Sequence, residues 1–323
     1  MNVIEKLEKY FNTGSTDKQH NRRLGGLLIA VTAMLLAVSI IVVGVGGVVA
    51  AILGISDGLK KPDEEEEGGP NPHLTEVALT DVTAKAEENK LFTLTNADVP
   101  LTEADYIKMQ QINRPKSAEG KHLYGCESAD HFALQKDAFE AFNAFVTAFY
   151  NEKGKTNLYV VLAYNDQGGN VSYFSNALAV KLEYVIDAAT SASIYGVEDY
   201  EWIYDHAHEY GFVRVSNVEG EENIFRYVGL ASAKYIQSQQ KKNKDNFYGL
   251  ESYIAEIKAS TPDTAIKISS VKKAIGESGT TAYYVYYMPA ESAAYKLPTD
   301  KYTYTVMAID GGYVVTYCKA EAK

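Results

Sequence analysis

The most prominent pattern in the chain is an apolar run from Leu24 to Ile55 that contains no charged residue. About 20 apolar residues suffice to cross the hydrocarbon core of a bilayer, and a helix in a soluble domain would show a polar face. The apolar region of a cleaved signal peptide, at roughly 7–15 residues, is shorter than this run. The pattern therefore predicts a retained transmembrane helix at 24–55, preceded by a cytoplasmic tail at 1–23.

The charges on either side of this run predict its orientation. Lys18, Arg22 and Arg23 precede the run, whereas residues 60–61 are basic but are followed directly by the acidic residues 64–67. Because Lys and Arg favour the cytoplasmic side, we expect a single-pass protein of the cell membrane with its N-terminus inside and its C-terminal part outside the cytoplasm. Residues 56–90 are rich in Pro, Gly and Glu, and this composition is typical of a stalk.

Beyond the stalk, the periodicity of apolar residues alternates between helical and strand-like segments. It predicts strands at 91–95, 158–163 and 212–215, apolar segments at 177–180 and 182–186, and helices at 134–150, 198–210, from about 230 to 240, and 249–258. Gly211 is expected to end the second helix. The C-terminal part has alternating, tyrosine-rich segments at 281–288, 301–309 and 312–318, with a hairpin turn at Asp310-Gly311. We expect an α+β domain at 91–260 and a β-rich extension at 261–323.

The charge and composition of the chain bear on which partners it can bind and on whether it can form a disulfide. The net charge is −11, which disfavours a nucleic-acid partner because phosphate backbones bind basic patches. The chain has 25 Tyr against one Trp, and tyrosines more often fill β-rich cores than line clefts. Cys126 and Cys318 lie outside the predicted cytoplasmic tail, where an oxidising compartment would permit a disulfide, but the sequence does not decide whether it forms.

Several motifs in the second half of the domain occur in the same order as in a known protein family. Residues 202–212 read W-I-Y-D-H-A-H-E-Y-G-F and residues 225–229 read F-R-Y-V-G. The chain thereby resembles the VanY-type D-alanyl-D-alanine carboxypeptidases, M15-like zinc peptidases in which the corresponding motifs are W-L-x-x-N-A-H-x-Y-G-F and E-P-W-H-F-R-Y-V-G. Weaker matches occur at 94–96, 100–101, 178–180 and 249–254. The resemblance implies a Hedgehog/DD-peptidase-like fold, a small antiparallel sheet with packed helices.

The resemblance also implies where zinc would bind, and these positions have changed. The family motif S-x-H-x-x-G-x-A-x-D, laid on residues 172–181, places Phe174 at the His and Lys181 at the Asp, and E-P-W-H places Ile224 at the last His. Phenyl and sec-butyl groups have no lone pair, and a lysine ammonium repels a cation. Glu221 matches the family's general base. We therefore expect no bound zinc, no other metal and no intact catalytic site.

A ligand-binding role is implied for four further residues by the same alignment. The family's S-x-Y-R-S segment falls on residues 162–166, so that Tyr164 is retained and Asn165 stands at the arginine that positions the substrate. Gln167 and Arg226 complete the set. Lys181 is in addition expected to place its ammonium at the old metal position and to pair with Glu221, unless its stem reaches out to solvent.

Three functions remain open on these grounds. The first is a zinc-free pseudoenzyme, anchored in the membrane through residues 24–55, that binds a peptidoglycan peptide or an envelope protein. The second is an active carboxypeptidase with displaced zinc ligands, which predicts that His131, His206 or His208 cluster with carboxylates. The third is a surface structural or adhesion protein whose tyrosine-rich tail is the functional part.

Overall fold

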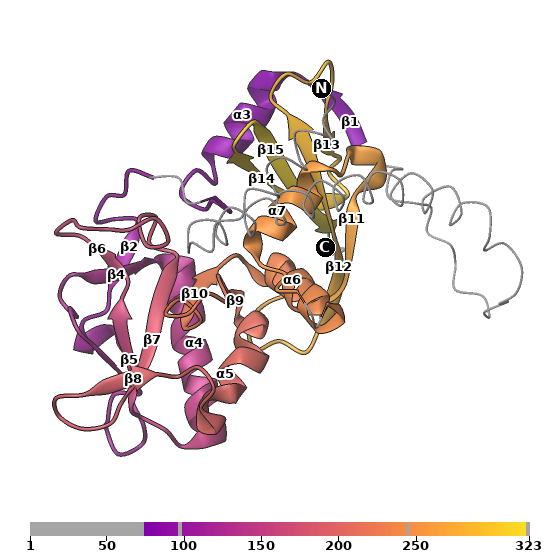
Figure 1. The fold of residues 1–323 in the computed structure, drawn as a ribbon. Coiled ribbons are helices and arrows are strands. Elements are labelled where there is room, and N and C mark those ends of the chain that lie inside the picture. The colour runs from indigo at the N-terminus through magenta and orange to yellow at the C-terminus, as the bar shows by residue number, and fades with distance from the viewer. Residues whose placement is uncertain (1–73, 96–98, 244–245, 321–323) are drawn as a thin grey trace, which may run out of the picture. The chain divides into compact units, whose positions relative to one another are not determined.

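The computed structural model describes residues 74–95, 99–243 and 246–320, which all belong to one compact unit (Figure 1). The predicted cytoplasmic tail, the transmembrane helix at 24–55 and the stalk as far as residue 73 lie outside the described residues. Within the described ranges, no helix is both long enough and apolar enough to cross a membrane.

The first half of the unit is built on a six-stranded sheet with the order β3-β5-β7-β10-β9, and β8 pairs with β7. Only β3 and β5 run parallel; the other pairs are antiparallel. The bounds are β3 Tyr124–Cys126, β5 Leu158–Leu162, β7 Ala179–Val185, β8 Ser191–Ser193, β9 Phe212–Arg214 and β10 Ile224–Tyr227. A smaller antiparallel sheet has the order β2-β4-β6, with β2 Tyr106–Lys108, β4 Phe132–Gln135 and β6 Tyr164–Asn165. The short helix η1 (Gln111–Asn113) follows β2.

Helix α4 (Lys136–Lys153) contributes four buried phenylalanines to the core of this half. Its helical spacing places Phe142, Phe145 and Phe149 on one face, where their side chains are completely or almost completely buried. These rings pack against Phe212 and Trp202. The helix ends at Gly154, which has the left-handed conformation of a C-cap. The helix predicted at 134–150 is thereby confirmed.

The segment predicted as a helix at 198–210 consists of three short helical pieces, η2 (Glu198–Tyr200), α5 (Glu201–His206) and η3 (Ala207–Tyr210). It ends at Gly211, as predicted, with φ of 81°. A side chain is excluded at Gly211, because a Cβ atom there would lie 2.6 Å from the ring of Tyr227. This close approach sets β9 directly beside β10.

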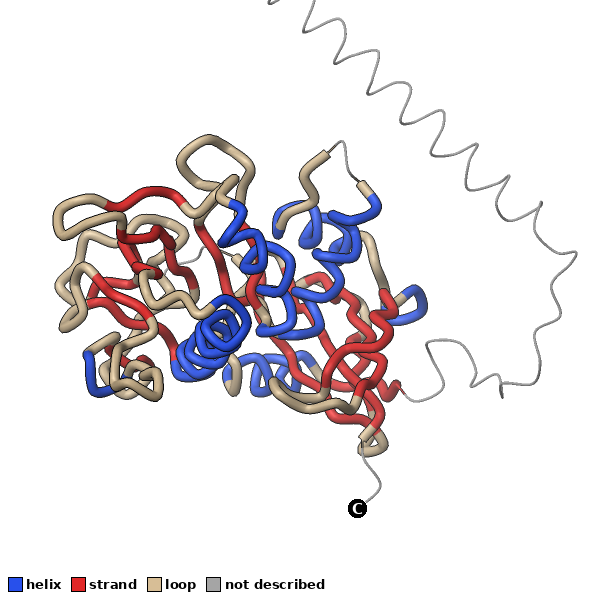
Figure 2. Tube along the Cα trace, turned by 90° about the horizontal axis from the view of Figure 1, so that it is seen from below, coloured by secondary structure: helices blue, strands red, loops and turns tan. Residues whose placement is uncertain are grey.

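The second half of the unit is a helical pair on a four-stranded antiparallel sheet. Helices α6 (Leu230–Lys242) and α7 (Leu250–Lys258) contact β11 and β12, respectively, and the sheet order is β11-β12-β15-β14. In Figure 2 helices lie between the two groups of strands. The bounds are β11 Ile266–Lys272, β12 Thr280–Pro289, β14 Tyr302–Ile309 and β15 Gly312–Lys319, with η4 at Pro262–Thr264.

The tyrosine-rich tail has the strands predicted from its alternation, and β14 and β15 are joined by a turn at Asp310-Gly311. Tyr286 and Tyr317 are buried in an apolar cluster with Val306 and Val315. These tail tyrosines therefore fill a core, in agreement with the commoner role of tyrosine in β-rich domains.

Two sequence predictions about the start of the domain are wrong. Part of the predicted stalk is folded: β1 (Leu74–Val77) pairs with β13 (Tyr295–Pro298), and α3 (Leu79–Glu87) contacts β14. Val82 and Ala86 supply the apolar contacts, since both are buried against the tail tyrosines. Residues 91–95 form no strand, because their carbonyl groups accept hydrogen bonds from side chains instead of a neighbouring strand.

No disulfide joins the two cysteines. Cys126 lies in β3 of the first sheet and Cys318 in β15 of the tail sheet. The Sγ atom of Cys126 instead contacts the Sδ atom of Met109 at 3.8 Å.

Candidate functional site

The positions at which the sequence motifs place the zinc ligands converge at one end of the β7–β10 pair. Lys181 in β7 lies directly opposite Ile224 in β10, so both side chains project from the same face of the sheet. Phe174 lies in the turn before β7 and packs with Ala179 and Ile224 in one apolar cluster. Phe174 is 2 % exposed and Ile224 is 5 % exposed. The structure therefore brings three motif positions from two separate segments into contact or direct pairing.

Lys181 and Glu221 do not pair as the sequence suggested. The Nζ atom of Lys181 donates a hydrogen bond to the carbonyl oxygen of Gly220 at 2.9 Å. The carboxylate of Glu221 accepts a hydrogen bond from the hydroxyl of Tyr173 at 3.3 Å, and burial raises the pKa of that hydroxyl. The ammonium group of Lys181 is thus bound to a backbone carbonyl of the 217–222 loop and not to a carboxylate.

This arrangement does not fit a zinc ion. Two of the three positions carry hydrocarbon side chains that fill the space with apolar contacts, and the third carries an ammonium group. No group of three His, Cys, Asp or Glu side chains that could hold a metal ion occurs within residues 74–95, 99–243 and 246–320.

The histidines that a displaced zinc site would need are engaged separately. His131 lies 3.3 Å from Asp166, His206 stacks on Trp202 with ring centroids 4.4 Å apart, and His208 is buried. Desolvation lowers the pKa of His208 to about 4, so its imidazole is neutral at physiological pH. The described residues thus give no support to the displaced-ligand hypothesis.

A cavity of about 380 Å³ lies beside the degenerate positions. We call it the Arg226 cavity. Tyr173 and Val215, which pack on the Phe174 cluster, form part of its wall. Its other lining residues are Leu94, Thr95, Arg226, Leu250, Glu251, Ile254, Ala255, Lys258 and Asp310.

Helix α7 contributes lining residues that the sequence analysis did not select. Leu250, Ile254 and Lys258 are spaced by four residues and therefore lie on one helix face, together with the neighbouring Glu251. The motif match at 249–254 marked this helix, but nothing in its residue pattern assigns it to the wall of a cavity.

Arg226, one of the four predicted ligand-binding residues, connects two segments of the fold. Its side chain is fully buried, and its Nη2 atom donates to the carbonyl oxygens of Thr93 at 3.0 Å and Thr95 at 2.7 Å. Desolvation lowers the pKa of Arg226 to about 10, which still leaves the guanidinium charged at neutral pH. Arg226 thus fastens the 92–95 segment to β10 at the edge of the cavity.

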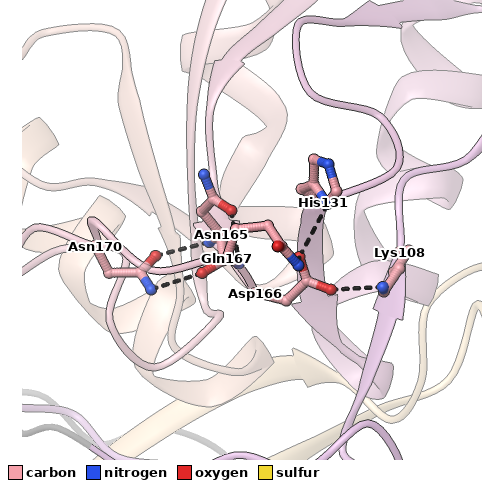
Figure 3. A network of polar contacts seen from close by, with 6 residues as sticks. All are labelled: Lys108, His131, Asn165, Asp166, Gln167 and Asn170. Atoms are coloured by element: carbon pink, nitrogen blue, oxygen red, sulfur yellow. Dashed lines mark hydrogen bonds and ion pairs between the residues drawn. The ribbon is translucent and has the colours of Figure 1, made fainter.

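Asn165 and Gln167 lie together in another network, at the end of β6 (Figure 3). Tyr164 directly precedes Asn165 in the same strand. Asn165 exchanges two hydrogen bonds with the side chain of Asn170, at 2.7 and 2.9 Å, and its own Oδ1 accepts from the backbone of Gln167. The ring of Tyr164 packs on Tyr106 with centroids 5.4 Å apart. None of the three predicted residues lines the Arg226 cavity.

Asp166 is the charged centre of this network. Its carboxylate lies 2.5 Å from Nζ of Lys108 and 3.3 Å from Nδ1 of His131. Burial by itself would raise the pKa of Asp166, but the hydrogen bonds from Lys108 and Gln167 and the charge of Lys108 outweigh burial and lower it. The carboxylate is therefore ionised and paired, which orders the loop that carries Asn165.

Comparisons with known proteins give one structural likeness. No family model matches the chain, and a search of curated proteins finds no match. The crystal structure of the vancomycin resistance D,D-dipeptidase VanXYg, in complex with a D-Ala-D-Ala phosphinate analogue, is similar to 76 % of this chain and 98 % of that chain, with 16 % sequence identity and a TM-score of 0.48. The family assignment therefore remains a prediction from the sequence motifs.

Proposed function

We propose that this protein is a membrane-anchored, carboxypeptidase-like pseudoenzyme that binds a cell-wall peptide outside the cytoplasm and does not cleave it. The observation that carries the proposal is the joint burial of Phe174 and Ile224, which stand where the motifs place two zinc-binding histidines. An apolar cluster with Lys181 beside it replaces the ligand set.

Glu221 alone supplies no hydrolytic chemistry at this position. A general base removes a proton efficiently from a water molecule whose pKa a metal ion has lowered from 15.7 to about 7. The Glu221 carboxylate instead accepts a hydrogen bond from Tyr173, and the ammonium group of Lys181 donates to the Gly220 carbonyl. The site retains the base of the motif without a group that would activate its water.

The Arg226 cavity supports a binding role. Leu94, Leu250 and Ile254 offer apolar surface for small side chains, while Glu251 and Lys258 offer opposite charges for the polar groups of a peptide. Its volume lies within the range of roughly 300–1,000 Å³ that is common for ligand sites. The uncharged run at 24–55 supports the membrane anchor, which would keep this cavity near the surface where wall precursors emerge.

The test uses the purified full-length chain and a wall pentapeptide that ends in D-Ala-D-Ala. We expect calorimetry to detect binding of the pentapeptide, metal analysis to find no stoichiometric zinc, and an assay for free D-alanine to find no release. Stoichiometric zinc together with D-alanine release would refute the pseudoenzyme. Absence of pentapeptide binding would refute the wall-peptide ligand. The binding partner would then have to be sought among envelope proteins.

A gain of metal binding tests the alignment itself. The triple variant Phe174→His, Lys181→Asp and Ile224→His restores the three ligand types at positions that the structure brings together. We expect it to bind one zinc ion at least about tenfold more tightly than the matched double variant Phe174→His, Lys181→Asp, because a third ligand completes the set. Equal affinities of the two variants would show that position 224 does not belong to the old metal site.

A further inference from the structure

A second cavity, of about 490 Å³, lies on another face of the β9–β10 pair. We call it the Arg214 cavity. Arg214 in β9 lies directly opposite Phe225 in β10, and both line it, whereas the next residue, Arg226, points to the other face and lines the cavity described above. The two cavities are therefore separate sites.

Arg214 lies among three aromatic rings. Its guanidinium carbon lies 4.9 Å from the ring centre of Phe247, 5.5 Å from that of Tyr195 and 5.9 Å from that of Tyr204. Among the described residues, none accepts a hydrogen bond from Arg214 or forms an ion pair with it. A guanidinium presents five donors in a planar fork that matches a carboxylate, so Arg214 is positioned to receive one from a ligand.

Two carboxylates line the same cavity at its rim. Glu201 and Asp205 are four residues apart on α5, so they lie on one helix face, and both are exposed. Neither is within ion-pair distance of Arg214, although all three side chains line one cavity. His208, which also lines it, is neutral at physiological pH. The cavity thus presents one positive and two negative groups that do not neutralise one another.

The wall of the cavity also contains three buried polar atoms without a hydrogen-bond partner among the described residues, the hydroxyl of Tyr204, the Nδ1 atom of His208 and the Nε2 atom of Gln240. Folded proteins keep few such atoms, since an unpaired buried donor destabilises the fold. Three of them around one cavity indicate that this wall is not optimised for stability alone.

We propose that the Arg214 cavity binds a small zwitterion of the amino-acid or short-peptide class. The ligand's carboxylate pairs with the Arg214 guanidinium, and its ammonium group binds at Glu201 and Asp205. A ligand with only a negative charge would meet the two carboxylates, and a ligand with only a positive charge would meet the guanidinium. A zwitterion satisfies both ends, and the rings of Tyr195 and Tyr204 offer contact to the part between them. This site does not depend on the function proposed for the Arg226 cavity.

The experiment measures binding of L-alanyl-L-alanine to the purified full-length chain by calorimetry, beside its N-acetyl and C-terminal amide forms. Each blocked form lacks one charge, and we expect each to bind at least about tenfold more weakly than the free dipeptide. Arg214→Gln and the double variant Glu201→Gln, Asp205→Asn are expected to weaken binding of the free dipeptide by a similar factor. Glu140→Gln, on the exposed face of α4, is the matched control and should leave binding unchanged.

Other outcomes overturn the proposal. Equal binding of the free and blocked dipeptides would exclude recognition of both charges, as would the absence of binding up to about 10 mM dipeptide. Unchanged binding in a folded Glu201→Gln, Asp205→Asn variant would exclude this cavity as the binding site. Because residues 201 and 205 are exposed, we expect this double variant to fold, so it tests the proposal even if Arg214→Gln does not fold. If Lys258→Gln abolishes dipeptide binding while Arg214→Gln does not, the dipeptide occupies the Arg226 cavity instead.

Discussion

Arg214 and Arg226 lie on paired strands and face opposite ways, and they differ in burial and in the groups that their guanidinium groups contact. Arg226 is fully buried and donates hydrogen bonds to the carbonyl oxygens of Thr93 and Thr95. Arg214 is half-buried, lies within 6 Å of three aromatic ring centres and has no such acceptor among the described residues. Both arginines line cavities of ligand size.

The comparison separates an arginine that maintains the fold from one that is available to a ligand. The family resemblance selected Arg226 as a ligand-binding residue and did not select Arg214. The contacts favour the reverse assignment, since the Nη2 group of Arg226 fixes the 92–95 segment. A guanidinium whose planar faces are covered by rings, and whose edge has no acceptor, retains its capacity to bind an anion.

The largest expected effect is therefore on stability, at Arg226. Arg226→Met keeps an apolar stem of similar length but removes the donors to two carbonyl oxygens, and hydrogen bonds from charged groups each contribute about 1.5–3 kcal/mol. We expect the free energy of unfolding to fall by roughly 3–5 kcal/mol, measured by urea denaturation of the full-length chain. A loss below about 1 kcal/mol would mean that the 92–95 segment is held by other contacts and that Arg226 is free to serve a ligand.

The second expected effect concerns the wall of the Arg214 cavity and depends on pH. Burial lowers the pKa of His208 from 6.5 to about 4. The unfolded chain therefore binds a proton at this position between pH 6.5 and 4 that the folded chain does not bind, and stability falls as the pH falls through this window. The full shift corresponds to a loss of about 3 kcal/mol by pH 4, at 1.36 kcal/mol per pKa unit.

The variant His208→Gln isolates this contribution from that of the carboxylates, which titrate nearby. Glutamine is neutral at every pH, so the difference in unfolding free energy between wild type and variant should change by up to about 3 kcal/mol from pH 7 to pH 4. If the unfolding free energies of the two proteins change in parallel with pH, His208 is hydrated in the folded chain. The wall of the Arg214 cavity at His208 is then more accessible to water than the burial of this residue indicates.

Local sequence patterns predicted those parts of the fold that depend on local physics. The apolar stripe at 134–150, the glycine at the end of the 198–210 segment and the Asp310-Gly311 turn are all present. Each depends on residues a few positions apart, and the chemistry of each is visible in a short window of sequence.

Long-range contacts explain the predictions that are wrong. Residues 91–95 have the composition of a strand, but Arg226, which is distant in sequence, donates hydrogen bonds to two of their carbonyl oxygens. Residues 74–87 look like part of a polar stalk, but β13 and the tail tyrosines give them a partner strand and an apolar surface. The Arg214 cavity combines α5, β9, β10 and α6, so no single window of sequence predicts it.

The third expected effect concerns a charge that is paired within the fold. Asp166→Asn removes the pairing with Lys108 and with His131, and it should lower the free energy of unfolding by about 1–2 kcal/mol at pH 7, because the pair is only partly buried. The pKa of Asp166 is lowered in the folded chain, so this contribution is present above the unfolded pKa near 3.8 and disappears as the pH falls through the folded value. Denaturation at pH 7 and at a series of pH values below 3.8 follows the disappearance of this contribution. A loss that stays equal across the series would point to the geometry of the loop and not to the charge.

The smallest expected effect on stability is at Arg214, and it completes the comparison. Arg214→Met retains a flexible stem whose sulfur packs beside Phe247, Tyr195 and Tyr204. Sulfur–aromatic contacts of about 0.3–1.5 kcal/mol each offset most of the roughly 0.5–1 kcal/mol that each lost cation–π contact contributes near the surface. We expect the free energy of unfolding to fall by no more than about 1 kcal/mol, against roughly 3–5 kcal/mol for Arg226→Met. A group that is exchanged at little cost to the fold is not retained for stability, so a small loss at Arg214 together with a loss of dipeptide affinity would assign its charge to the ligand. A loss as large as that at Arg226 would instead make both arginines structural and would remove the basis for a second site.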